Sequence, residues 1–68
     1  MAVVKMIELL GTSPTSWEEA ARNAVTEAAK TLRNITGLHV ISQTAVVKDG
    51  VITEYRADVK IAFMVKEV

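Results

Sequence analysis

The stretch ITEYRADVKIAFMVKEV (residues 52–68) alternates apolar and polar side chains along most of its length. A period of two residues is typical of a β-strand with one buried and one polar face. We therefore expect a strand over residues 52–66. Its apolar face carries Tyr55, Ala57, Val59, Ile61, Phe63 and Val65. Its other face carries Glu54, Arg56, Asp58, Lys60 and Lys66, interrupted by Ala62 and Met64.

This strand is long for the chain that contains it. At ~3.3 Å per residue it spans on the order of 50 Å. A compact globule of 68 residues is only about 22–24 Å across. The far end of the strand is therefore expected to pack on neighbouring copies of the same chain.

Residues 1–68 are expected to form one small domain. Below roughly 70–80 residues a single core seldom supplies more than ~3–5 kcal/mol, so disulfides, a metal or partner subunits usually add stability. The chain has no cysteine, which excludes disulfides, thiolate metal sites and thiol catalysis. Its one histidine cannot build a zinc site without symmetry-related copies. Association with other copies is the remaining source of stability.

The charges balance, with eight basic and eight acidic residues. Nucleic-acid binding needs clustered lysine and arginine, which this sequence lacks. No apolar run approaches the ~20 residues of a membrane span. The start, MAVVKMIELLGTS (residues 1–13), is interpreted as a first strand rather than a signal peptide. We expect a cytoplasmic protein that binds neither nucleic acid nor membrane.

Residues 16–34 have the pattern of an amphipathic helix. Apolar side chains, mostly alanine, recur at spacings of three and four from Trp17 to Leu32. Ser16 and Glu19 have the spacing of a capping box at the helix start. The helix is expected to end near Asn34, with Gly37 free to adopt a positive φ.

Two further strands complete the expected fold. Residues 3–10 and 38–47 are rich in β-branched and other apolar residues. Asp49–Gly50 between the second and third strands is a strong hairpin signal. The order β-α-β-β predicts an α+β fold in which one helix covers one face of a three-stranded antiparallel sheet. The other face is left to partners.

Catalysis is not supported by the sequence. The serines available as nucleophiles are Ser13, Ser16 and Ser42, and none has a recognisable base. Glu54 and Asp58 share a strand face but stand two pleats apart, about 13 Å, which is too far for an acid–base pair in one chain. We therefore expect that the protein is not an enzyme.

Two single residues allow more than one interpretation. His39, near the start of the second strand, is either an ordinary strand residue or a ligand contact, and the first is favoured. Trp17 opens the apolar stripe of the helix, so a core position is favoured over a platform for a cofactor.

The stretches ELLGTSPTSWEEAARNAV (residues 8–25) and VVKDGVITEYRADVKIAF (residues 46–63), in a β-α-β-β chain of this length, resemble the dodecins. The resemblance covers essentially the whole chain. It implies a three-stranded antiparallel sheet wrapped around one helix. It also implies a homododecamer, a hollow sphere with tetrahedral symmetry, which agrees with the association expected from strand length.

The resemblance also implies ligands. Dodecins bind flavins, and bacterial ones also coenzyme A, using a tryptophan after the helix and a glutamine on the last strand. These positions correspond to Gly37 and Arg56, and a bacterial ligand-binding arginine corresponds to Thr44. All three residues depart from the family pattern. The candidate cofactor-binding residues are therefore Gly37, His39, Thr44 and Arg56. The helix start GTSPTSWE is similar to that of a calcium-binding branch.

Three functions follow as alternatives. The first is a flavin- or coenzyme A-type carrier or buffer whose flavin binding is weakened or lost. The second is a calcium-binding protein in which carboxylates such as Glu54 and Asp58 meet across symmetry axes. The third is a purely structural hollow assembly. For Arg56, an inter-subunit ion pair with Glu54 or Asp58 is favoured over contact with an anionic ligand.

Overall fold

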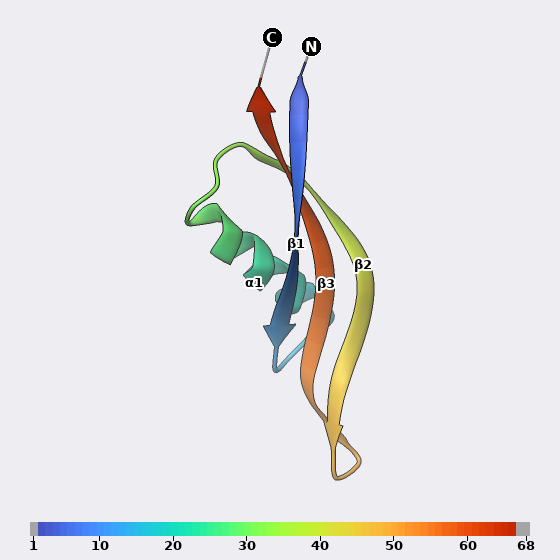
Figure 1. The fold of residues 1–68 in the computed structure, drawn as a ribbon. Helices are drawn as coiled ribbons and strands as arrows, with labels where there is room; N and C mark the ends of the chain where they lie inside the picture. Colours follow the sequence, from blue (N-terminus) through green and yellow to red (C-terminus); the bar gives the residue numbers. More distant parts are fainter. Residues whose placement is uncertain (1, 67–68) are drawn as a thin grey trace.

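The computed structural model describes residues 2–66 as one sheet and one helix (Figure 1). The elements are β1 (Val3–Ser13), α1 (Trp17–Ala29), β2 (Ile35–Lys48) and β3 (Val51–Lys66). The strand order is β1-β3-β2, and both pairings are antiparallel. The expected α+β fold and its β-α-β-β order are confirmed. Within the described residues α1 is too short and too polar to cross a membrane.

The sheet is much longer than the helix that covers it. The chain measures 53 × 20 × 13 Å, and its radius of gyration is 13.9 Å, against about 11 Å for a compact chain of this length. Figure 1 shows the start of β1 and the end of β3 extending past the helix at one end, and the β2–β3 hairpin extending at the other. The strand length expected from the alternating pattern is confirmed.

The helix starts at the expected cap. The Glu19 N–H donates to Ser16 Oγ over 3.0 Å. The Glu19 carboxylate does not return to the Ser16 backbone as in a full capping box, but accepts from the Thr15 hydroxyl. The preceding turn is held by Ser13 Oγ, which accepts from the N–H groups of Thr15 and Ser16. This segment turns the chain from sheet to helix within three residues.

The helix ends earlier than the sequence suggested. It stops at Ala29 rather than near Asn34, and the N–H groups of Lys30 and Thr31 donate three residues back. The left-handed residue is Asn34 (φ 60), so the expected positive φ at Gly37 was wrong. Pairing with β3 explains the difference, because the Met64 N–H donates to the Asn34 carbonyl over 3.0 Å. The second strand therefore begins at Ile35.

The strands also pair further than expected, and not always regularly. β1 continues to Ser13 because residues 11–13 pair with residues 57–55 of β3. The hairpin turn has positive φ at Asp49 and Gly50, as Asp–Gly predicts. One extra residue interrupts the β2–β3 ladder at each of Thr36, Ile41 and Thr53. Such bulges increase local twist and shift which face later side chains occupy.

The core is narrow and rich in alanine. Its fully buried members from β3 are Ala57, Val59 and Ile61, each 0% exposed, and the helix contributes Ala20, Ala21, Ala24 and Ala28. The apolar face of β3 is thus confirmed at its centre. Phe63 is only half-buried and Val65 is exposed, so the expected burial of these two was wrong for a single chain. Both lie where the sheet extends past the helix.

We expect Gly11→Ala to destabilise the fold by about 1–3 kcal/mol or more. A Cβ at Gly11 would lie 2.0 Å from the carbonyl oxygen of Ala20, which is helix backbone and cannot move aside cheaply. Gly37→Ala is the matched control, because its Cβ would lie 3.8 Å from the Ala62 Cβ, an ordinary contact. Urea denaturation at one protein concentration should show a lower midpoint for Gly11→Ala alone. Equal midpoints for the two variants would contradict the close approach.

Candidate functional site

The sheet has one face toward α1 and one without a helix, which we call the open face. Directly opposed residues in an antiparallel pair point to the same side. Since Ala57, Val59 and Ile61 are buried against the helix, their neighbours along β3 point the other way. The central residues of the open face are Met6, Glu8, Leu10, Thr12, Gly37, His39, Ser42, Thr44, Arg56, Asp58, Lys60 and Ala62.

All four candidate cofactor-binding residues lie on the open face, but in two separate places. Gly37 pairs with Ala62, and His39 pairs with Lys60 one row away. Thr44 and Arg56 are a direct cross-strand pair. The two places are six residues apart along β3, or about 20 Å. Within one chain, a single aromatic ring system therefore cannot contact both Gly37 and Arg56.

Arg56 forms an ion pair inside the chain. Its Nε donates to Glu54 Oε2 over 2.7 Å, and both side chains are partly exposed. Thr12 and Thr44 flank Arg56 in the same row of the open face. An arginine carries five N–H donors, and Glu54 is the one side-chain partner recorded for it among residues 2–66. The expected inter-subunit ion pair stays a prediction, whereas within the chain Arg56 pairs with Glu54 and its guanidinium still has donors for an anion.

Two carboxylates meet on the open face. The pKa of Glu8 is raised above its ordinary value of 4.5, first by a hydrogen bond with the Asp58 side chain and then by the charge of Asp58. Desolvation adds to this rise in pKa, and the nearby Lys60 opposes it. Asp58 is thus adjacent to Glu8 within the chain, and the meeting of Glu54 with Asp58 across symmetry axes stays a prediction. Sequence reasoning missed Glu8 because only the β1–β3 register brings the two residues together.

These two carboxylates are oxygen ligands of the kind that a hard cation prefers. Among residues 2–66, no group of three or more His, Cys, Asp or Glu side chains is placed to hold a metal ion. A cation at Glu8 and Asp58 would therefore need water or another copy of the chain to complete its coordination.

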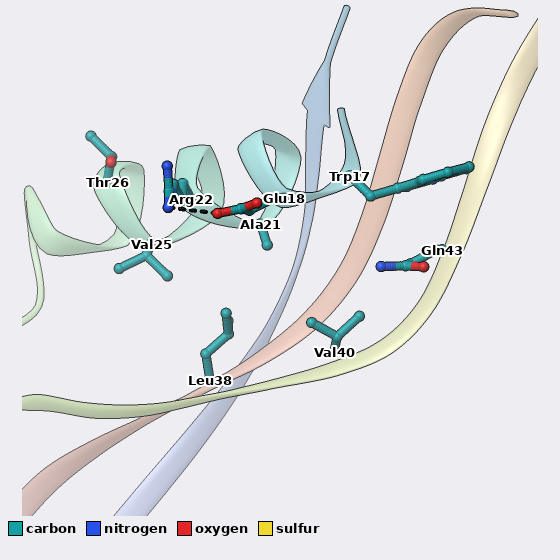
Figure 2. A pocket seen from close by; sticks show the side chains of 9 residues that line it. All are labelled: Trp17, Glu18, Ala21, Arg22, Val25, Thr26, Leu38, Val40 and Gln43. Atoms are coloured by element: carbon teal, nitrogen blue, oxygen red, sulfur yellow. Dashed lines mark hydrogen bonds and ion pairs between the residues drawn. The ribbon is translucent and has the colours of Figure 1, made fainter. Parts of the chain in front are cut away.

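A groove lies on the opposite side of the sheet, between α1 and β2 (Figure 2). It has a volume of about 620 Å³. We call it the helix–β2 groove, and its lining residues are Trp17, Glu18, Ala21, Arg22, Val25, Thr26, Leu38, Val40 and Gln43. Figure 2 shows Leu38 and Val40 pointing from β2 toward the helix. The sequence did not reveal this groove, because the bulges in β2 hide which side chains face the helix.

Trp17 stands at one end of the helix–β2 groove. Its indole N–H donates to the Thr44 carbonyl over 2.7 Å. Its ring meets Tyr55 edge to face, with 4.9 Å between centroids. Trp17 is half-buried, so it both closes the end of the core and forms a wall of the groove.

Comparison with known proteins gives one consistent family. Residues 3–66 match the family model described as Dodecin. The chain is 38% identical over 66 residues to calcium dodecin of Mycobacterium tuberculosis, covering 97% of this chain and 93% of that protein. Two solved structures show the same fold.

The dodecin from Streptomyces coelicolor superposes with a TM-score of 0.92 at 31% identity, covering 98% of this chain and 96% of that chain. The crystal structure of the Mycobacterium tuberculosis calcium dodecin has a TM-score of 0.80 at 42% identity, covering 90% of this chain and 87% of that chain. It is described as calcium chelating, with a novel calcium-binding site.

Proposed function

The chain belongs to the dodecin family, and from this premise we propose that it is a single-domain, homo-oligomeric small-ligand-binding protein with weak or no flavin binding. The observation that carries the proposal is the open face. It belongs to a chain 53 Å long, carries Arg56 with donors for a ligand, and is covered by no helix within the described residues. The proposed activity is binding and not catalysis.

The surface of the chain supports assembly. Its accessible area is 4848 Å², against about 4,200 Å² for a compact monomer of this mass. Large apolar side chains on all three strands are 40–61% exposed. The outer edges of β1 and β2 also lack a partner strand within the described sheet, and unpaired edges favour association. Twelve copies is the number that the family resemblance implies.

We expect sedimentation to give a closed particle close to twelve times the chain mass of 7.4 kDa. The expectation follows because one chain leaves its open face and both sheet ends uncovered. The measurement is sedimentation equilibrium at micromolar concentration over several loading concentrations. A monomer or a simple dimer under these conditions would contradict the proposed homo-oligomer.

Weak flavin binding follows from Gly37 and Arg56, which must come from different copies to meet one flavin because they lie about 20 Å apart within a chain. An aromatic ring that stacks on a ligand contributes ~1 kcal/mol beyond its buried area, and its area contributes ~2 kcal/mol more. Gly37 provides neither. Arg56 can donate to a carbonyl or phosphate but cannot accept from a ring N–H, and Glu54 already holds its Nε. If both losses apply, flavin binding weakens by about a hundredfold or more.

We predict that the protein purifies colourless and that Gly37→Trp with Arg56→Gln strengthens riboflavin binding by about a hundredfold or more. The backbone at Gly37 accepts a Cβ, since the nearest atom to it would be 3.8 Å away. Fluorescence titration of riboflavin measures the affinity, and the two single variants separate the contributions. Submicromolar quenching by the unmodified protein would show that the two departures do not matter.

The Glu8–Asp58 pair favours a second candidate function, binding of a hard cation such as calcium. A hydrogen bond with the Asp58 side chain and then the charge of Asp58 raise the pKa of Glu8, and a divalent cation would offset the repulsion between the two carboxylates. The relative called calcium dodecin, 38% identical to this chain, makes calcium the first ion to test. Oxygen ligands from water or from another copy would complete the shell of six to eight oxygens that calcium takes.

We expect Glu8→Gln or Asp58→Asn to weaken calcium binding at least tenfold, measured by calorimetric titration, whereas the exposed helix variant Glu27→Gln has no effect. The sign of the pH dependence follows from the raised pKa. Folded Glu8 binds its proton more tightly than unfolded Glu8, so the repulsion grows as the pH rises through this pKa. Calcium binding should therefore weaken as the pH falls through the raised pKa of Glu8. Equal affinity in all three variants would rule out this pair.

A further inference from the structure

The helix–β2 groove is an apolar surface that the chain itself leaves uncovered. Leu38 is paired with Ile61, and Val40 with Val59. The β3 members of these pairs are 0% exposed, whereas Leu38 is 43% and Val40 is 40% exposed. The helix covers β1 and β3 and stops short of the neighbouring strand (Figure 1). The core pairs Leu38–Ile61 and Val40–Val59 are therefore buried on β3 but exposed to solvent on β2.

A second uncovered apolar surface lies at the β2–β3 hairpin, residues 47–52, which we call the hairpin tip. Val47 is 59%, Val51 61% and Ile52 43% exposed. Figure 1 shows the hairpin tip extending away from the helix, so it cannot reach the groove of its own chain. The left-handed pair Asp49 and Gly50 makes a tight turn, which presents the tip in one conformation and lowers the cost of ordering it on binding.

The charges of the two surfaces are complementary. The rim of the helix–β2 groove carries Glu18 and Arg22, which form an exposed ion pair at 2.6 Å. The hairpin tip carries Lys48 beside Asp49. One positive and one negative charge on each surface can pair crosswise. Exposed pairs of this kind set the orientation of a contact more than its strength.

We propose that the hairpin tip of one copy occupies the helix–β2 groove of the next. The inference rests on the proposed homo-oligomer and names one of its contacts. A second copy buries two apolar surfaces in one contact, whereas a small ligand would cover the groove and leave the tip exposed. Because groove and tip are different surfaces, the contact is heterologous, and repeating it generates a ring when the rotation between copies closes.

The absence of cysteine from the sequence allows a direct test. We would make Val40→Cys with Val51→Cys and treat the assembled protein with a short bismaleimide. Val40 pairs with Val59, eight residues from Val51 along β3, or about 26 Å, so the reagent cannot link the two within one chain. The expected result is a ladder of covalent multimers on a denaturing gel. Each single variant should stop at the dimer.

The matched control is Arg33→Cys with Val51→Cys, in which the first cysteine is exposed but outside the groove. It should give at least tenfold less multimer. Charge reversal is a second test of the same contact. Arg22→Glu or Asp49→Lys alone should weaken assembly about fivefold per contact. The two substitutions together should restore assembly. The proposal would be overturned if the Val40→Cys/Val51→Cys protein and the Arg33→Cys control gave equal amounts of multimer. It would also be overturned if the double charge reversal did not restore assembly.

A mixing experiment separates this inference from the oligomer itself. Val40→Asp blocks the groove and Val51→Asp blocks the tip, so neither variant alone should form the closed particle. Mixed in equal amounts, they keep one intact groove and one intact tip and should form heterodimers. Wild-type protein that sediments as a monomer refutes the homo-oligomer. If wild-type protein assembles but the mixed variants do not associate, only the groove contact is refuted. The same holds if native mass spectrometry shows a copurified small molecule in the groove of the wild-type protein.

Discussion

The closeness of α1 to the sheet is the constraint on which the rest of the structure depends. Gly11 has no Cβ, and a Cβ at this position would lie 2.0 Å from the Ala20 carbonyl oxygen. The helix face that meets the sheet is built of alanine, with Ala20, Ala24 and Ala28 nearly or fully buried. A helix this close to β1 and β3 meets β2 at Trp17 but leaves Leu38 and Val40 of that strand exposed. The thin core therefore leaves the helix–β2 groove open along the helix.

Much of the fold could be predicted because its signals are local. The alternation in β3, the alanine stripe of α1, the Ser16 cap and the Asp49–Gly50 turn each act within a few residues, and all four are present. The helix end could not be predicted in the same way. It depends on the hydrogen bond between the Met64 N–H and the Asn34 carbonyl, which joins residues thirty positions apart and appears only when the sheet has formed.

In the candidate site, too, features set by one strand could be predicted, whereas features set by pairing between strands could not. The open-face positions of Arg56 and Asp58 follow from the alternation of one strand. The Glu8–Asp58 pair and the separation of Gly37 from Arg56 depend on the register between strands, which one sequence does not reveal. The alternation of side chains between the two faces is interrupted twice within β2. Its bulges at Thr36 and Ile41 shift the alternation, so that Val40 faces the helix while Ser42 faces away from it.

The bulges also divide the sheet mechanically. From Val4 to Ser13 the β1–β3 ladder runs without an extra residue, whereas the β2–β3 ladder is interrupted three times. An uninterrupted ladder resists bending, and each interruption is a point where a strand can coil more tightly. The two sides of the sheet therefore differ in shape, because the β2 side gains local twist at each interruption that the β1 side lacks from Val4 to Ser13.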